Sequence, residues 1–446
     1  MPMVSINTPQ VAQTPPKSTS DLIVENPKKG VLEPQTRLKI GNLDPREPAE
    51  DAEDQNIDLE TEKIKKSLEE KFDPKKYTIS KLVGQGTFGM VYKAKNNHIK
   101  KTVAIKKTMQ DPKLKNREFE ILVCLDHINC IRVHNYYFTN EKVSKEELQK
   151  AKKAGLHKNE NESSSADSGD SRGSRERSNY PKRAIFLNIV MDYYPENLYG
   201  IYRFYGKSKA KLPEALCMLY SYQLIRAVNY LKTLKICHRD IKPQNILINT
   251  KTQQLVLCDF GSAKRYSSTE SSIAYICSRY YRAPELLLQQ EYYDYKIDMW
   301  SVGCVLAEMW HGMPLFPGQS SQDQLFRIAS ILGKPSPKEV VAMNPLYKGP
   351  LPEVNAVPLS RVLKSASPLA LDLLTKILVY DPKKRIEPLE ALKHPYFDQL
   401  RLKNLTINGR KIVDLFGFTE QEIGAELVVW NQLVPGWYRK MKQGEK

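Results

Sequence analysis

Residues 237–264 read C-H-R-D-I-K-P-Q-N-I-L-I-N-T-K-T-Q-Q-L-V-L-C-D-F-G-S-A-K. Two short apolar runs in this stretch, Ile246–Ile248 and Leu255–Cys258, are separated by a polar turn. Short apolar runs bounded by turn residues are typical of buried strands. The stretch therefore predicts a hairpin with a polar loop at each end.

The loops next to this hairpin carry the side chains of Asp240, Asn245 and Asp259. Closing the hairpin brings both loops to the same end, so we expect these side chains to line one cleft. Mg²⁺ is a hard cation that prefers carboxylate, amide and phosphate oxygens. The arrangement predicts a site for a magnesium–nucleotide complex. A surface loop that happens to hold acids is the alternative, and the upstream motifs argue against it.

A glycine-rich segment precedes the hairpin by about 150 residues, and residues 84–91 read G-Q-G-T-F-G-M-V. A dinucleotide-binding turn has similar spacing, but it opens a helix. Here both flanks are typical of strands, which predicts a glycine hairpin whose backbone N–H groups approach phosphates. The strand Val103–Lys106, V-A-I-K, then places a lysine at its end.

The segment Lys115–Leu125 has apolar residues at helical spacing, so we expect a helix after the lysine-bearing strand. Glu118 in this helix is placed to pair with Lys106. Arg117 beside it faces a different direction, because neighbouring residues of a helix do not share a face.

Two further strands, Ile131–Phe138 and Ala184–Met191, flank an insertion at Thr139–Arg183 that is charged at first and then rich in serine. Asp192–Pro195 ends the second strand and should form a hinge between two lobes. The pattern becomes helical from Leu212, with one apolar face formed by Leu216, Tyr220, Leu224, Ala227 and Leu231.

Three residues of the second half have expected structural roles. We expect Asp298 to accept hydrogen bonds from backbone amides of the Asp240 loop. Arg385 should form a buried ion pair with Glu285. The globular body should end near His394–Phe397.

Composition limits the class of protein. The chain has 446 residues, a net charge of +17 and seven irregularly spaced cysteines, which predicts free thiols in a reducing compartment. It contains no run of eighteen apolar residues and no signal peptide, so we expect no membrane insertion and a cytoplasmic location, with nuclear access left open. The positive charge permits a nucleic-acid partner, but neither an aromatic-interleaved basic stripe nor a zinc pattern supports one.

The N-terminal residues 1–56 are rich in proline, serine, threonine, glutamine and charge, which predicts disorder. Residues 57–72 have apolar residues at helical spacing and could dock as a short helix. Residues 44–62 are acidic. A solvated tail and a regulatory arm that folds back on the basic body both remain open for them.

These motifs together resemble those of eukaryotic protein kinases, and in particular the glycogen synthase kinase 3 (shaggy-like) family of the CMGC group. The carrying segments are K-N-R-E (115–118), C-H-R-D-I-K-P-Q-N (237–245), L-C-D-F-G-S-A-K (257–264), Y-I-C-S-R-Y-Y-R-A-P-E-L (275–286) and G-C-V-L-A-E-M (303–309). The resemblance runs from about Tyr77 to Leu402, with a weaker match at Asn408–Ile423.

The resemblance implies an α+β, bilobal fold with a small antiparallel-sheet lobe that carries one helix and a larger, mostly helical lobe. The implied division is an N-terminal extension at 1–72, a small lobe at 73–193 with an insertion at 139–183, a large lobe at 194–400 and a tail at 401–446.

The resemblance also implies a serine/threonine kinase that uses ATP and Mg²⁺. Asp240 would accept the proton of the substrate hydroxyl, and Lys242 would contact the transferred phosphoryl group. The other implied catalytic residues are Asn245, Lys106 and Glu118, with Asn245 and Asp259 as metal ligands. The implied ATP contacts are Val83, Gly84, Gln85, Gly86, Thr87, Phe88, Gly89, Met90, Val91, Ala104, Lys106, Met191, Asp192 and Tyr194, with Met191 as the gatekeeper.

For substrates, the resemblance implies proteins that already carry a phosphate, in the pattern S/T-x-x-x-pS/pT. Arg117, Arg239 and Lys264 would bind that phosphate. A phosphosite in the kinase's own segment Ser267–Ser272 is the alternative occupant of the same pocket. Tyr275 matches a tyrosine on which such kinases phosphorylate themselves.

The chain departs from the family in three places. Its N-terminus has no arginine-rich segment ahead of a serine, so the family's inhibitory serine has no counterpart. The loop Leu346–Val354 lacks the aromatic pattern of the family's scaffold-binding groove, and Phe326 and Arg327 differ too, which predicts weak or absent binding of scaffold proteins. The insertion at 139–183 is longer than usual.

Other functions are less well supported. A mitogen-activated or cyclin-dependent kinase would have T-x-Y where Ala274 precedes Tyr275, or a P-S-T-A-I-R-E-like helix where this chain has K-N-R-E. A catalytically inactive scaffold would normally lack Lys106, Asp240 or Asp259. Cys258 is better explained as a small packed residue than as a redox group.

Overall fold

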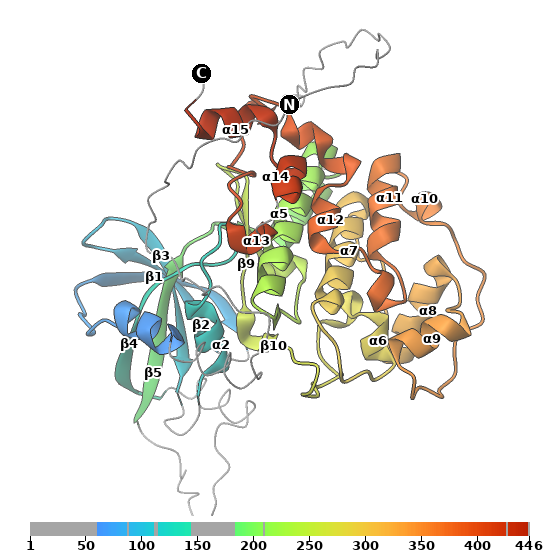
Figure 1. The fold of residues 1–446 in the computed structure, drawn as a ribbon. Coiled ribbons are helices and arrows are strands. Elements are labelled where there is room, and N and C mark those ends of the chain that lie inside the picture. Colours follow the sequence, from blue (N-terminus) through green and yellow to red (C-terminus); the bar gives the residue numbers. More distant parts are fainter. Residues whose placement is uncertain are drawn as a thin grey trace, which may run out of the picture.

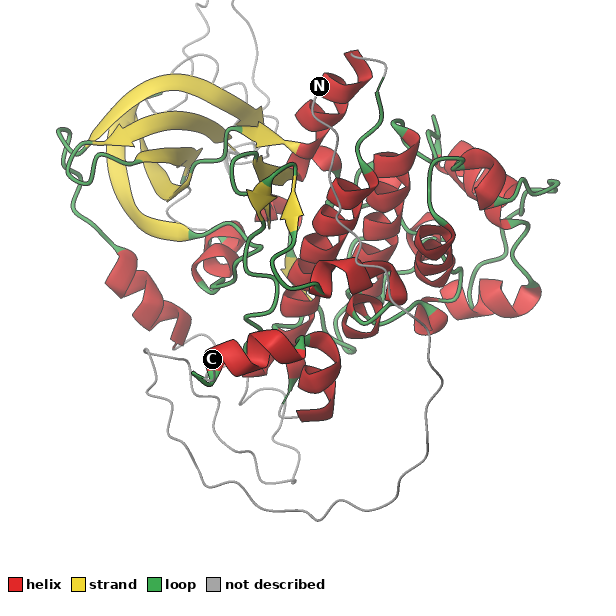
Figure 2. Cartoon of the chain, turned by 90° about the horizontal axis from the view of Figure 1, so that it is seen from above, coloured by secondary structure: helices red, strands yellow, loops and turns green. Residues whose placement is uncertain are grey.

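The protein is described by a computed structural model that covers residues 60–86, 89–110, 115–143, 183–207, 210–424 and 427–444. Figure 1 shows a smaller lobe built on a β-sheet beside a larger lobe built mainly of helices. Seen from above in Figure 2, the strands gather on one side and most of the helices on the other. The α+β, two-lobed architecture expected from the sequence is confirmed.

One antiparallel sheet organises the small lobe, and its strand order is β1-β2-β3-β5-β4. The strands are β1 (Tyr77–Gly86), β2 (Gly89–Asn96), β3 (Thr102–Met109), β4 (Val133–Lys142) and β5 (Arg183–Asp192). Side chains of a strand alternate between its two faces. Val190 of β5 accordingly packs with Val103 and Ile105 of β3, whereas Leu187 and Ile189 face the main core, which includes helix α2 (Arg117–Val123).

The strands β4 and β5 are longer than the sequence pattern predicted. We expected Ile131–Phe138 and Ala184–Met191, but pairing continues outward to the pair Lys142–Arg183. The predicted insertion at 139–183 therefore includes strand residues at both ends. The last residues of β4, Thr139–Lys142, are polar and show no alternation of apolar and polar side chains. A prediction based on hydrophobicity therefore ends the strand too early. The rest of the insertion, residues 144–182, lies outside the described residues.

The large lobe contains most of the helices. They are α4 (Leu198–Lys207), α5 (Glu214–Thr233), α6 (Pro284–Leu287), α7 (Lys296–His311), α8 (Ser321–Leu332), α9 (Pro337–Met343), α10 (Leu359–Val362), α11 (Pro368–Ile377) and α12 (Pro388–Leu392). The tail adds α13 (Glu420–Ile423), α14 (Leu427–Leu433) and α15 (Gly436–Lys442), after the strands β11 (Thr406–Ile407) and β12 (Arg410–Lys411).

Helices α5 and α7 form the centre of the large lobe. The sequence predicted one apolar face on α5, but every residue from Ala215 to Leu231 is buried. A helix that is buried on all sides needs neighbours all round. For α5 these are α7, α12, β9 (Gln254–Leu257) and α13 of the tail. Gly312 ends α7 in the left-handed conformation, with φ of 85°, which glycine adopts readily.

Short strands fix the loops next to the predicted hairpin. The hairpin is confirmed as β8 (Ile246–Asn249) paired with β9; β8 begins where predicted and ends one residue later, and β9 begins and ends one residue earlier than predicted. The two-residue strand β6 (Glu196–Asn197) adds to β8, and β7 (Ile236–Cys237) pairs with β10 (Lys264–Arg265). The loops that carry Asp240 and Asp259 therefore begin and end on paired backbone.

The two structural ion contacts predicted from the sequence are confirmed. Asp298 accepts hydrogen bonds from the backbone N–H groups of His238 (2.6 Å) and Arg239 (2.9 Å). Arg385 forms a fork with both carboxylate oxygens of Glu285, at 2.8 and 3.0 Å, and both side chains are buried. Such paired and hydrogen-bonded charges are the form in which buried ions are tolerated.

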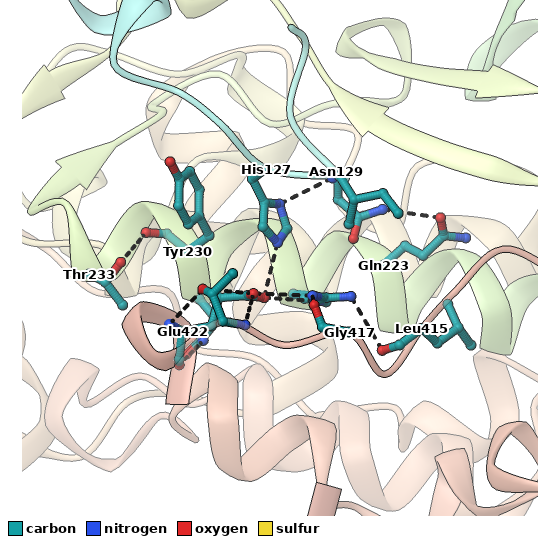
Figure 3. A network of polar contacts seen from close by, with 12 residues as sticks. His127, Asn129, Gln223, Tyr230, Thr233, Leu415, Gly417 and Glu422 are labelled. Atoms are coloured by element: carbon teal, nitrogen blue, oxygen red, sulfur yellow. Dashed lines mark hydrogen bonds and ion pairs between the residues drawn. The ribbon is translucent and has the colours of Figure 1, made fainter. Parts of the chain in front are cut away.

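The expectation that the globular body ends near residue 397 is wrong, because the C-terminal tail packs into the molecule. Figure 3 shows Glu422 of α13 beneath His127, in a network that also reaches Leu415 and Gly417. Its carboxylate accepts hydrogen bonds from Arg226 of α5 at 2.7 and 3.1 Å and contacts His127 Nε2 at 3.0 Å. The tail thus completes the core around α5.

These buried groups influence one another's protonation. Burial raises the pKa of Glu422, but hydrogen bonds from His127 and Arg226 outweigh it and hold the pKa at about 2. Burial lowers the pKa of His127 below its ordinary value. The carboxylate of Glu422 is therefore ionised at neutral pH.

Three remaining expectations concern the N-terminal region, the cysteines and membrane insertion. A helix spans residues 60–68, within the predicted 57–72, while the predicted disordered residues 1–56 and most of the acidic segment lie outside the described residues. All seven cysteines are free thiols, as expected. Among the described helices, none is both long and apolar enough to cross a membrane.

Candidate active site

A deep cleft of about 1820 Å³ separates the two lobes and contains most of the residues singled out from the sequence. Its small-lobe wall includes Ala104, Lys106 and Glu118, and its floor includes Asp240 and Asp259. Further lining residues from the predicted set are Val83, Gly84, Gln85, Gly89, Val91, Met191, Asp192, Tyr194, Lys242 and Asn245.

A chain of charges crosses the back of the cleft. The Lys106 ammonium group of β3 is paired with the carboxylate of Glu118 on α2 and lies 3.3 Å from Asp259 Oδ1. Burial lowers the pKa of Lys106, but Glu118 and then Asp259 outweigh it, so the pKa is raised. Burial raises the pKa of Asp259, but the neighbouring positive charges, Lys106 first among them, together lower it by more, so the pKa of Asp259 is below its ordinary value. The shifts favour the charged forms of Lys106 and Asp259, and the two contacts of Lys106 join β3, α2 and the Asp259 loop.

A second network surrounds Asp240. Its Oδ2 accepts hydrogen bonds from Lys242 Nζ (2.6 Å) and Asn245 Nδ2 (3.0 Å), and its Oδ1 accepts one from Ser278 Oγ (2.7 Å). Asn245 also donates to the Asp240 carbonyl at 2.9 Å. These contacts hold the Asp240 carboxylate in one orientation at the wall of the cleft.

Ser278 was missed by the sequence analysis. It belongs to the segment that follows Tyr275, far along the chain from Asp240, and no local pattern marks it as a partner. Its contacts with Asp240 and Lys242 (3.1 Å) arise because this segment folds back over the loop that follows β7.

The residues present suit a magnesium ion. The amide nitrogen of Asn245 is used by Asp240, which leaves its oxygen for a metal. The Asp259 carboxylate is about half-exposed toward the cleft, with 47% of its side chain accessible. Within the described ranges no cluster of three or more His, Cys, Asp or Glu side chains could hold a metal alone. Phosphate and water oxygens would have to complete the coordination of Mg²⁺.

The glycine hairpin lies over the cleft as β1 and β2. Gly89 has φ of +156°, and a Cβ there would lie 2.5 Å from the Lys107 carbonyl oxygen, so a side chain does not fit. Met90, predicted to contact ATP, is not among the cleft-lining residues. It alternates with Gly89 and Val91 along β2 and therefore faces the other side. Thr87 and Phe88 lie outside the described residues.

The segment between the lobes begins at the buried Met191. The backbone N–H of Asp192 donates to the Arg132 carbonyl at 3.4 Å, so this donor is already used within the protein. Hydrogen bonds from His134 and Lys101 hold the pKa of the Asp192 side chain at about 2. Cys258 lies in the wall nearby, and burial raises the pKa of its thiol, which agrees with a packed, unreactive residue.

The three cations predicted to bind a phosphate, Arg117, Arg239 and Lys264, come from three different segments, and Arg117 and Arg239 lie close enough to interact. Burial and then the neighbouring Arg239 lower the pKa of Arg117, as expected for two cations close together. Arg239 donates to the Ser262 carbonyl (2.6 Å) and the Tyr293 hydroxyl (3.2 Å).

Lys264 is turned toward the chain's own segment. It pairs with Glu270 Oε1 at 2.8 Å and donates to Ser272 Oγ at 3.2 Å. A carboxylate of the protein itself therefore pairs with one of the three cations predicted to bind a phosphate. The prediction from the sequence named the segment Ser267–Ser272 as a possible phosphosite, but Glu270 within it was not predicted as a partner of Lys264.

Tyr275 lies on the surface beside two arginines, with 60% of the residue exposed. The guanidinium carbon of Arg282 lies 4.2 Å from the centre of its ring. Hydrogen bonds from Arg279 and Arg282 lower the pKa of the Tyr275 hydroxyl below its ordinary value. The same cations could stabilise a phosphate on this oxygen.

The sheet lobe, the helical lobe and the cleft between them define the bilobal fold of the protein kinases. Consistent with this, residues 178–397 match the family model of the protein kinase domain. The match supports a eukaryotic protein kinase. The matched range begins before β5 and includes Asp240, Asn245 and Asp259. The glycine hairpin, Lys106 and Glu118 precede this range, and the contact of Lys106 with Asp259 connects them to it.

Proposed function

We propose that this chain is an active serine/threonine protein kinase of the glycogen synthase kinase 3 type, which transfers the γ-phosphate of ATP to proteins that already carry a phosphate. The observation that carries the proposal is the convergence of two fixed networks on one cleft. Lys106, Glu118 and Asp259 form the first network, and Asp240 with Lys242 forms the core of the second.

In this proposal the residues act mainly by positioning and by charge. The glycine hairpin and Lys106 would hold the phosphates of ATP, and Asn245 with Asp259 would hold Mg²⁺, which neutralises charge on the phosphates when bound. Asp240 would orient the substrate hydroxyl and accept its proton, while Lys242 neutralises the phosphoryl group. Phosphoryl transfer requires little else of the protein.

A direct test is turnover of ATP on two synthetic peptides that differ only in a phosphoserine four residues after the target serine. Phosphate transfer to the primed peptide should be faster by tenfold or more, because several cations near Arg117 meet a dianion only there. Absence of transfer to both peptides and to a casein-like protein would refute kinase activity. Equal transfer to both would refute the preference alone.

Arg117→Ala should lower kcat/KM on the primed peptide by about tenfold, since charge-assisted hydrogen bonds contribute roughly 1.5–3 kcal/mol each. The unprimed peptide should lose little, because it offers no dianion to Arg117. Arg361→Ala, which removes an exposed arginine on α10, is the matched control. An equal loss on both peptides would make Arg117 a structural residue.

A substrate phosphate that binds Lys264 would have to displace Glu270. Glu270 pairs with Lys264 at the pocket, but a carboxylate carries one negative charge and a phosphate nearly two. The substrate phosphate should therefore compete successfully. Glu270→Gln should lower KM for the primed peptide without changing KM for the unprimed one.

Tyr275 should carry phosphate in protein made in a bacterium that lacks other such kinases, since the active enzyme would modify itself. The Asp259→Ala variant should lack that phosphate, because it loses a proposed Mg²⁺ ligand. Mass spectrometry of the tryptic peptide measures both. An unmodified Tyr275 in fully active enzyme would contradict the self-modification.

A further inference from the structure

The helix over residues 60–68 lies beside α2, and Figure 1 shows it in blue next to that helix. Two contacts join their side chains. Thr61 Oγ1 lies 3.2 Å from Cys124 Sγ, just beyond the end of α2. Lys65 Nζ lies 3.4 Å from Glu120 Oε1 in the middle of α2. The two helices are therefore connected over the C-terminal half of α2.

The contact continues past the end of the first helix. Ile64 and Leu68 pack against the main hydrophobic core. The backbone N–H of Glu70 then donates to the carbonyl of Tyr136 at 2.9 Å, so the chain covers the open edge of the sheet at β4. The Tyr136 ring meets the ring of Phe119 in α2 at 4.5 Å. The segment thus holds both the sheet edge and α2.

Helix α2 needs such support. It has only seven residues, and a helix of this length is not stable without tertiary packing. Glu118 and Glu120 lie two positions apart and so point in different directions. Glu118 pairs with Lys106 in the cleft, while Glu120 meets Lys65 outside it. A displacement of α2 at its outer face would therefore separate the pair in the cleft.

We propose that residues 60–76 form an N-terminal clamp that holds α2 where Glu118 pairs with Lys106, with Lys65 as a positioning residue. The proposal rests on the proposed kinase function for its effect on turnover. An enzyme whose α2 is undocked for part of the time works only in the docked fraction. The clamp raises that fraction within the same chain, without a separate partner protein.

The test uses the full chain with Lys65→Glu, which places a carboxylate against Glu120 at the outer face of α2 and also removes the 2.7 Å pair of Lys65 with Glu62 in its own helix. We expect kcat/KM for ATP to fall about tenfold, equally on primed and unprimed peptides, with KM for the peptides unchanged. Amide hydrogen exchange in residues 117–123 should become faster, while exchange in α5 stays the same. Lys66→Glu is the matched control, since Lys66 is exposed on the same helix and the charge change is identical.

Charge reversal separates a specific contact from general damage. The double variant Lys65→Glu/Glu120→Lys restores an opposite-charge pair between the two helices, so turnover and slow exchange in α2 should recover in part, while the contact with Glu62 stays lost. If Lys65→Glu does not fold well, Lys65→Gln should give the same changes at about threefold. The clamp is refuted if Lys65→Glu matches Lys66→Glu in both measurements, or if the double variant restores neither. Because exchange is measured without substrate, it tests the clamp even if the wild-type chain transfers no phosphate.

Discussion

Replacing Asp240 by asparagine should lower kcat by about 10²- to 10⁴-fold, the usual effect of removing a general base. The variant should fold normally, because its amide oxygen can still accept hydrogen bonds from Lys242 and Asn245, while its NH2 group can donate to the Ser278 hydroxyl. Binding of Mg²⁺-ATP should persist, since Asn245 and Asp259 remain. Steady-state kinetics, thermal unfolding and calorimetric titration with Mg²⁺-ATP measure the three quantities.

Asp398→Asn provides the control for that experiment. Asp398 is exposed, does not line the cleft and pairs with Arg401, so its replacement should leave kcat unchanged. An Asp240→Asn enzyme that keeps most of its kcat would contradict the role proposed for Asp240. One that no longer binds nucleotide would instead place Asp240 in the ATP site.

Glu422→Ala should lower the free energy of unfolding by about 3–5 kcal/mol, because removing one partner of a buried ion pair leaves the other charge without compensation. The charge left behind is Arg226, whose side chain is only 2% exposed. Denaturant unfolding of the full chain measures the loss. Glu422→Gln should cost less than Glu422→Ala, since an amide can still accept the hydrogen bond from Arg226.

The matched control lies two residues earlier in the same short helix. Glu420 is exposed, and Glu420→Ala should cost less than about 1 kcal/mol, mainly through a weaker interaction with the helix dipole. Equal effects of the two substitutions would mean that α13 is stabilised by its helical turn alone. In that case the contacts with Arg226 and His127 would contribute nothing measurable.

The sequence predicted the parts of the site that short motifs determine. The hairpin around Asn249, the charged pair of Lys106 with Glu118, and the backbone contacts of Asp298 follow from local spacing and simple chemistry. Met90 was predicted to contact ATP together with both of its neighbours. Side chains alternate along a strand, so Met90 points away from the face on which Gly89 and Val91 line the cleft.

The remaining features depend on contacts between distant parts of the chain. Arg226 and Glu422 are separated by 196 positions, and neither lies in a pattern that identifies the other. The same holds for Ser278 with Asp240. The C-terminal tail accordingly looked peripheral in the sequence, although α5 is buried on the side that the tail covers.

The pairing of Lys142 with Arg183 has a consequence for how the gene could change. The two residues are paired in the sheet, so the connection between β4 and β5 begins and ends at neighbouring positions. For a polymer held at two points, doubling the intervening length raises the closure entropy cost by only about 0.6 kcal/mol. Changes in the number of residues between Lys142 and Arg183 should therefore have little effect on the pairing of β4 with β5.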